Sequence, residues 1–265
     1  MALAKAGDVE LSYDRTGTGP PLLLIMGMSG TKHHWGESFL EDLQRDFDTI
    51  VYDHRDAGDS TKTGAPFTIA DLAADADGLL DALGVDSAHV MGISMGGMIA
   101  QELALAHPQR IRTLTLGCTY CGGEGSALAS EDVMRRLAEG MASGDRERAI
   151  RTAWEVNVSP SFAANEDIYA TFLARGLRYG VPVAVIMEQM RAIATHDTHS
   201  RLPDLQASTL VLHGTLDEML PVQNGRMIAE LIPDARLEIL EGIGHVFFLE
   251  EPQRSAELVR EHATL

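Results

Sequence analysis

The chain has 265 residues and a formal net charge of −18 at pH 7. This length is enough to bury a sizeable core and to form one large α/β domain with a modest insertion. The acidic balance repels phosphate backbones and anionic lipid surfaces, which argues against nucleic-acid and membrane partners. Residues 1–8 hold no apolar stretch of signal-peptide length, so we expect a cytoplasmic protein.

Short apolar runs alternate with helical patterns over the first 121 residues. We expect five strands in this part, at residues 9–13, 22–26, 49–52, 88–93 and 111–116. The first of them is expected to be an edge strand in an opening hairpin. Three helices are expected between the strands, at residues 39–44, 68–83 and 95–107. This alternation is typical of a mainly parallel sheet with crossover helices.

The alternation stops between residues 122 and 201. Four helical patterns occupy this segment, at residues 131–141, 146–156, 166–179 and 181–195. The segment is also richer in aromatic residues than the sheet region. We predict that 122–201 is a helical cap folded over the carboxyl edge of the sheet. Most of its aromatic side chains are expected to form the core of the cap, and a minority to line a substrate pocket.

Strand and helix patterns return after the cap. We expect strands at 209–213 and 237–240, a helix between them at 221–232, and a last helix that Pro252 opens. The core domain is therefore expected to comprise residues 1–121 and 202–265.

The segment Gly92-Ile93-Ser94-Met95-Gly96 follows an expected strand and begins an expected helix, as a G-x-S-x-G nucleophile elbow does. A serine on such a sharp turn has a strained backbone, and side chains two residues away on either side would collide with it. Gly92 and Gly96 avoid that collision. Ser94 is therefore the candidate nucleophile, and the N–H of Met95, at the helix N-terminus, is a candidate oxyanion donor.

A serine nucleophile near pH 7 needs a base and an acid that orients the base. Because the loops after parallel strands converge at one edge of the sheet, both should follow strand ends. Asp217 follows the strand at 209–213, and His245 follows the strand at 237–240. Each could alone be an ordinary loop residue, and Glu218 is a rival acid. The chain order of serine, aspartate and histidine matches the elbow fold and predicts a Ser94–His245–Asp217 triad.

The second oxyanion donor is expected in the loop after the strand at 22–26. Met26-Gly27-Met28-Ser29-Gly30 occupies this loop. The glycine before Met28 permits close approach of the backbone to a ligand. We therefore expect the N–H of Met28 to bind the oxyanion together with the N–H of Met95.

Two cysteines, Cys118 and Cys121, have the C-x-x-C spacing of zinc or redox sites. Zinc would need two further ligands at suitable spacing, and a redox dithiol would sit at a helix N-terminus, whereas Cys118 ends an expected strand. We expect both cysteines to be small buried residues. No metal ligand set is expected, and the histidine pairs at 33–34 and 196–199 are interpreted as loop residues.

The motifs together resemble those of the α/β-hydrolase superfamily over essentially the whole chain. Met26-Gly27 stands where that family usually has His-Gly, and Arg55-Asp56-Ala57-Gly58 where it usually has Arg-Gly-x-Gly. Both variants are similar to those of the aclacinomycin-methylesterase-like branch, and residues 92–98 are similar to the 3-oxoadipate enol-lactonase branch. The resemblance implies a mostly parallel eight-stranded sheet flanked by helices, with the cap inserted after the sixth strand.

These features predict a serine hydrolase that cleaves carboxylic esters or lactones of medium-sized hydrophobic small molecules through an acyl-enzyme. No metal or organic cofactor is implied. The expected partner is the small-molecule substrate, and a homodimer is left open. Carbon–carbon bond hydrolysis and cofactor-free perhydrolysis are alternatives that use the same triad. A non-catalytic protein that binds a small ligand on this scaffold is a third alternative.

Overall fold

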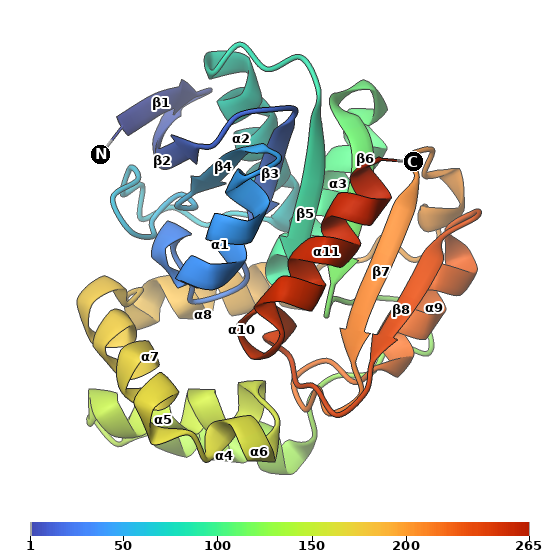
Figure 1. Ribbon diagram of the computed structural model, residues 1–265. Helices are drawn as coiled ribbons and strands as arrows, with labels where there is room; N and C mark the ends of the chain where they lie inside the picture. Colours follow the sequence, from blue (N-terminus) through green and yellow to red (C-terminus); the bar gives the residue numbers. More distant parts are fainter. Residues whose placement is uncertain (1, 265) are drawn as a thin grey trace.

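Eight strands form one sheet in the computed structural model, which describes residues 2–264 (Figure 1). Their bounds are β1 Ala2–Ala6, β2 Val9–Thr16, β3 Pro21–Ile25, β4 Asp48–Tyr52, β5 Ala88–Ile93, β6 Ile111–Gly117, β7 Thr209–Gly214 and β8 Arg236–Leu240. The strand order across the sheet is β1-β2-β4-β3-β5-β6-β7-β8. Only the pairs that β2 makes with β1 and β4 are antiparallel. The expected mostly parallel eight-stranded sheet is confirmed.

The prediction that residues 9–13 form the edge strand is wrong. β2 lies between β1 and β4, and β1 is the edge of the sheet. The small side chains of Ala4 and Ala6 in β1 are buried, and helix α2 (Ile69–Ala82) packs so closely that a Cβ on Gly78 would lie 3.0 Å from the Cα of Ala6. Alanine carries little strand signal, so this strand has no clear sequence pattern.

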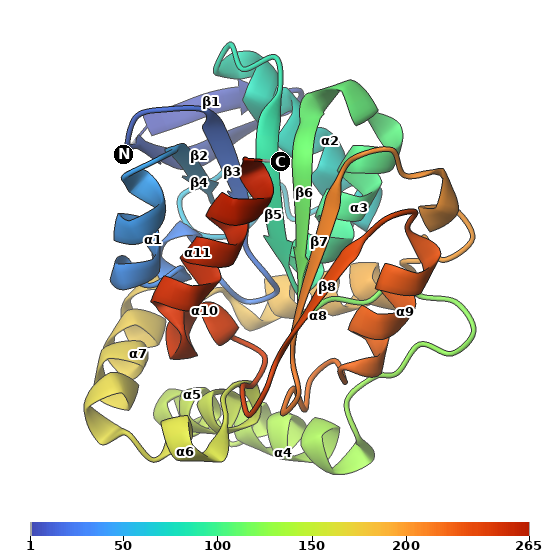
Figure 2. The same cartoon turned by 45° about the vertical axis from the view of Figure 1, so that its right-hand side comes forward.

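Helices cover both faces of the sheet (Figures 1 and 2). One face carries α1 (Glu37–Gln44), α10 (Phe247–Glu250) and α11 (Pro252–Ala263), and the other carries α2, α3 (Met95–Ala106) and α9 (Gln223–Leu231). Successive residues of β3 point to opposite faces, so Leu23 joins one buried apolar cluster and Leu24 the other. Three short 3₁₀ helices lie at η1 Lys32–His34, η2 Pro108–Arg110 and η3 Leu202–Asp204.

Five α-helices lie between β6 and β7. They are α4 Glu131–Ala142, α5 Arg146–Asn157, α6 Pro160–Ala163, α7 Glu166–Tyr179 and α8 Val183–Ala194. We call α4 to α8 the cap, because in both views they lie together beyond the carboxyl ends of β5 and β7 (Figures 1 and 2). The residues that follow each parallel strand therefore lie at the edge of the sheet nearest the cap.

The aromatic side chains of the cap largely contact one another, as expected. Trp154 is buried, and its ring centroid lies 4.9 Å from that of Phe172, 5.4 Å from Phe162 and 6.2 Å from Tyr169. Tyr179 differs, because it stacks on His33 of η1 with the ring centroids 3.9 Å apart. The cap thus has a small core of its own and one aromatic contact with the sheet domain.

Within residues 2–264, no helix combines the length and apolarity that a bilayer crossing requires.

Candidate active site

Ser94 lies at a strained turn between β5 and α3. Its φ of 55° and ψ of −125° fall in a region that non-glycine residues rarely adopt. The turn is tight, because a Cβ on Gly92 would lie 2.1 Å from the carbonyl oxygen of Gly96, and one on Gly96 would lie 2.0 Å from that of Ile25. Two hydrogen bonds hold the turn in place. Ser94 N donates to Gly117 O at 2.9 Å, and Thr119 Oγ1 donates to Ser94 O at 2.7 Å. Ser94 is partly exposed in an otherwise buried segment.

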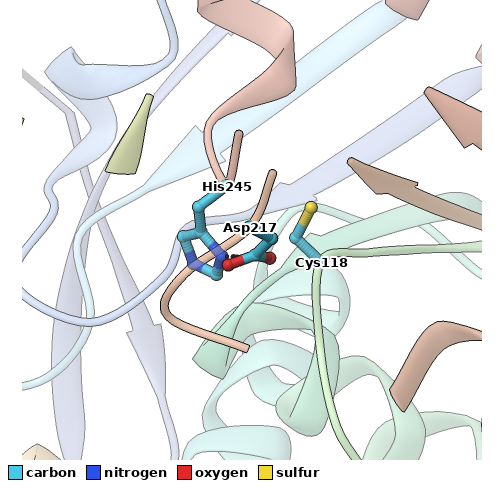
Figure 3. Close-up of side chains that lie close together, drawn as sticks. All are labelled: Cys118, Asp217 and His245. Atoms are coloured by element: carbon cyan, nitrogen blue, oxygen red, sulfur yellow. Dashed lines mark hydrogen bonds and ion pairs between the residues drawn. The ribbon is translucent and has the colours of Figure 1, made fainter. Parts of the chain in front are cut away.

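Asp217 and His245, which are 28 residues apart, meet at the end of the sheet (Figure 3). The Nδ1–H of His245 donates to Oδ2 of Asp217 at 2.7 Å, and both residues are buried. Since Nδ1 carries the hydrogen in this bond, Nε2 of the neutral ring is left as the proton acceptor. The rival acid Glu218 points elsewhere: its side chain is 53% exposed and lies 3.7 Å from Arg136.

Asp217 has three further polar partners. Its Oδ1 accepts hydrogen bonds from the N–H groups of Met219 at 2.9 Å and Leu220 at 2.8 Å. Its Oδ2 also lies 3.2 Å from Nε2 of His213, which donates to the carbonyl oxygen of Leu220 at 2.6 Å. Burial alone would raise the pKa of the Asp217 carboxyl, but His245 and His213 outweigh it and lower this pKa below its usual range. Asp217 is therefore ionised and fixed in place.

Ser94 lies close to this pair in the fold. The N–H of Ser94 donates a hydrogen bond to the carbonyl oxygen of Gly117. Cys118, which follows Gly117 in the chain, has its sulfur within 4.8 Å of a carboxylate oxygen of Asp217 and a ring nitrogen of His245. No direct hydrogen bond between Ser94 and His245 occurs in the described part of the chain. In enzymes without substrate such bonds are often long, and they tighten when substrate binds.

The loop over Ser94 is residues 26–30. A Cβ on Gly27 would lie 3.0 Å from Ser94 Cβ and 3.6 Å from its Oγ, so a side chain at position 27 would require the Ser94 turn to shift by a few tenths of an ångström. The N–H groups of Met28 and Met95 donate to no acceptor within residues 2–264. Both expected oxyanion donors thus come from segments that border Ser94, and neither is used elsewhere.

Cys118, Asp217 and His245 together have the composition of a metal site (Figure 3). Burial and the nearby Asp217 charge raise the pKa of the Cys118 thiol well above its usual value, so it stays protonated. Metals bind the thiolate, and Oδ2 of Asp217 is already shared by two imidazoles. A metal ion here would have to displace the thiol proton and compete with the two imidazoles for this oxygen. Cys118 and Cys121 are both buried, as expected from the sequence.

Several supporting residues had no recognisable sequence signal. His54 is buried, which lowers its pKa, and its Nε2–H donates to the carbonyl oxygen of Met26 at 2.8 Å. Glu250 accepts a hydrogen bond from Gly244 N at 2.8 Å, next to His245. His213 could have been suspected, because it is the last residue but one of β7 and lies four residues before Asp217. Of the histidine pairs, His33 and His34 are not in a loop but in η1, and Nδ1 of His34 accepts from Thr31 N at 3.0 Å.

Comparison with known proteins agrees with this architecture. A model of the alpha/beta hydrolase fold family matches residues 20–252. A protein described as carbamate hydrolase RutD, from Azorhizobium caulinodans, is 31% identical over 260 residues, which span 98% of this chain and 97% of the relative.

Two solved structures share the fold over nearly the whole chain. Est816, an N-acyl homoserine lactone degrading enzyme, has a TM-score of 0.78 at 29% identity and covers 98% of this chain and 99% of its own. The enol-lactonase from Burkholderia xenovorans LB400 has a TM-score of 0.86 at 24% identity, and all of both chains is covered. Together with the strand order and the turn at Ser94, these matches show that the chain belongs to the α/β-hydrolase family.

Proposed function

We propose that the protein is a serine hydrolase that cleaves carboxylic esters or lactones through an acyl-enzyme. The observation that carries the proposal is the buried 2.7 Å hydrogen bond between His245 and Asp217, beside a strained turn that presents Ser94. Nucleophile, acid and base then follow the ends of β5, β7 and β8, which meet at one edge of the sheet.

In the first half-reaction, Ser94 Oγ attacks the carbonyl carbon while Nε2 of His245 takes its proton. The N–H groups of Met28 and Met95 stabilise the resulting oxyanion, and one such donor contributes roughly 3 to 4 kcal/mol. The tetrahedral intermediate collapses, the bond to the leaving oxygen breaks, and His245 gives the proton to that oxygen. Asp217 stabilises the imidazolium that forms in between.

In the second half-reaction, water replaces the alcohol. His245 takes a proton from the water as its oxygen attacks the acyl carbon, and a second oxyanion forms at the same two N–H groups. Collapse returns the proton to Ser94 and releases the carboxylic acid. A lactone follows the same steps, except that its leaving oxygen becomes a hydroxyl group that stays on the acyl chain, so that a single hydroxy acid is released.

The relatives support hydrolysis of an acyl–heteroatom bond. The name of the Azorhizobium relative indicates a carbamate, and that of Est816 a lactone. A carbamate is therefore a second candidate substrate class, favoured by the 31% identity over nearly the full length of both chains. The same nucleophile, base and oxyanion donors would cleave it.

The test is a panel of p-nitrophenyl esters and carbamates with acyl groups of increasing length. Purified protein should hydrolyse esters with medium-sized apolar acyl groups, and Ser94→Ala should abolish turnover and fluorophosphonate labelling while the circular dichroism spectrum is unchanged. Ser200→Ala, at an exposed turn, is the matched control and should keep both. Labelling of the Ser94→Ala variant would mean that the nucleophile is another residue. Failure of the wild type to cleave any substrate would favour the ligand-binding alternative.

A further inference from the structure

Gln189 is a fully buried polar side chain on the cap helix α8. Its Oε1 atom accepts a hydrogen bond from the N–H of Ser29 at 2.9 Å. Ser29 directly follows Met28 in the loop that approaches Ser94 through Gly27. The amide of Gln189 therefore lies against the loop that borders the candidate nucleophile, although it comes from the cap.

The bond to Ser29 determines which end of the amide faces the loop. A backbone N–H can only donate, so Gln189 must present its oxygen to Ser29, and its Nε2 group takes the other position. Within residues 2–264 no acceptor lies in hydrogen-bond distance of this Nε2. Folded proteins rarely leave a buried donor unpaired, because its lost hydration is then not replaced.

Helix α8 cannot easily turn to bring Nε2 to an acceptor of the protein. Before Gln189, Glu188 Oε1 accepts from Phe67 N at 3.0 Å. After it, Arg191 Nη2 donates to Phe67 O at 2.8 Å, and Tyr120 Oη donates to Ile193 O at 2.9 Å. Because these bonds anchor the helix on both sides, the free donor is held in a fixed place.

We propose that Gln189 is a substrate-binding residue whose Nε2 group donates a hydrogen bond to an acceptor oxygen that the substrate carries next to its scissile carbonyl. The proposal rests on the serine-hydrolase function proposed above and refines its substrate class. A site with a buried unpaired donor discriminates against a ligand that lacks the acceptor, because the donor then stays unpaired. The substrate is thus an ester, lactone or carbamate with a second oxygen, such as an ether or carbonyl, near the reacting carbon.

The experiment compares esters that differ only in one atom of the acyl chain. The first pair is p-nitrophenyl methoxyacetate and p-nitrophenyl butyrate, and the second is p-nitrophenyl 3-methoxypropionate and p-nitrophenyl pentanoate. For each pair, the ratio of the two kcat/KM values is divided by the ratio of the two rate constants for alkaline hydrolysis, which corrects for the intrinsic reactivity of the esters. Wild-type protein should prefer the oxygen-containing ester of at least one pair by about three- to tenfold, as expected for one neutral hydrogen bond. Gln189→Met, which keeps the length of the side chain but has no donor, should lose this preference.

The Gln189→Glu variant separates the proposed hydrogen bond to the substrate from the hydrogen bond to Ser29. It keeps an acceptor for the Ser29 N–H but lacks the NH₂ group, so it should also lose the preference, and it carries the test if Gln189→Met does not fold. Gln253→Met, the same change at an exposed site of α11, should behave as wild type. A preference retained in Gln189→Glu, or absent from the wild type in both pairs, overturns the proposal. Lack of hydrolysis by the wild type of all four esters and of the p-nitrophenyl carbamates of the panel would instead contradict the serine-hydrolase function.

Discussion

At the scale of single residues, Asp217 is the most constrained side chain of the site. Two imidazoles and two backbone N–H groups surround its carboxylate, and its pKa is lowered below the usual range by the histidines, against the effect of burial. The group is therefore an anion with fixed orientation. Its proposed role depends on that orientation, because the acceptor at Oδ2 decides which nitrogen of His245 carries the hydrogen.

We expect Asp217→Asn to lower kcat by about 10⁴-fold with little change in KM. The asparagine oxygen can still accept from Met219 and Leu220, which leaves the amide NH₂ facing His245. The imidazole must then present an unprotonated Nδ1, so Nε2 carries the hydrogen and cannot accept the proton of Ser94. Steady-state kinetics on the best ester of the panel measure this effect. Glu218→Gln, at the exposed neighbouring carboxylate, is the control, and an equal loss there would contradict the assignment of the acid.

The sequence identified the residues with local signals and missed those defined by contacts across the chain. Gly92 and Gly96 mark the elbow because the turn itself excludes side chains, and Asp217 and His245 are found because strand ends converge. Gln189 has no such mark, since its partner Ser29 lies 160 residues away and only the packing of the cap joins them. Glu250 was missed for the same reason.

At the scale of secondary structure, the junction of β5 and α3 has the least spare room. A Cβ on Gly96 would lie 2.0 Å from Ile25 O and 2.8 Å from Met26 O, and these are backbone atoms that cannot move aside. β3 and the start of α3 can approach this closely only because residue 96 is a glycine. Placement of the candidate nucleophile therefore depends on the contact between these two elements.

Gly96→Ala should lower kcat/KM by at least about 10²-fold, since the clash must displace the turn by a sizeable fraction of an ångström. It should also lower the thermal midpoint by several degrees. The matched control is Gly176→Ala in α7, where the new Cβ would meet only the flexible end of Ile150, at 3.2 Å. Kinetics together with a thermal melt of both variants check this. Normal activity in Gly96→Ala would show that the elbow tolerates a shift.

The expected elements agree with the structure where the apolar pattern is long. The cap helices expected at 131–141, 146–156 and 166–179 match α4, α5 and α7 to within one residue at each end. Ser130, Asp145 and Asn165 cap these three helices and provide a local start signal. The short helices α6 and α10 were not expected, because four residues are too few to show a period.

At the scale of the whole molecule, stability should depend on pH through buried histidines. Burial lowers the pKa of His34 to about 4, assisted by Arg175, and burial also lowers that of His196 to about 4. Both imidazoles have a pKa near 6.5 in an unfolded chain. Between about pH 6.5 and 4 the unfolded state therefore binds protons that the folded state does not, and stability falls as the pH falls.

We expect each of the two histidines to remove on the order of 2 kcal/mol of stability between pH 7 and pH 5. Urea unfolding at a series of pH values measures the total. His34→Gln can still accept the Thr31 hydrogen bond but does not titrate, so its stability should fall less steeply over this range. An identical slope for the variant and the wild type would contradict the assignment, whatever the absolute stabilities.

Glu250 links the position of the cap to the loop that holds the proposed base, His245. Its Oε1 accepts from Gly244 N at 2.8 Å, beside His245, and from Ser159 N at 3.0 Å, at the start of α6. The carbonyl oxygen of Asn157 also accepts from Val246 N at 3.0 Å, on the other side of His245. Any movement of α6 away from this loop must stretch these bonds and displace the segment that carries His245. In the proposed mechanism, α6 must therefore keep its place against this loop while His245 transfers protons.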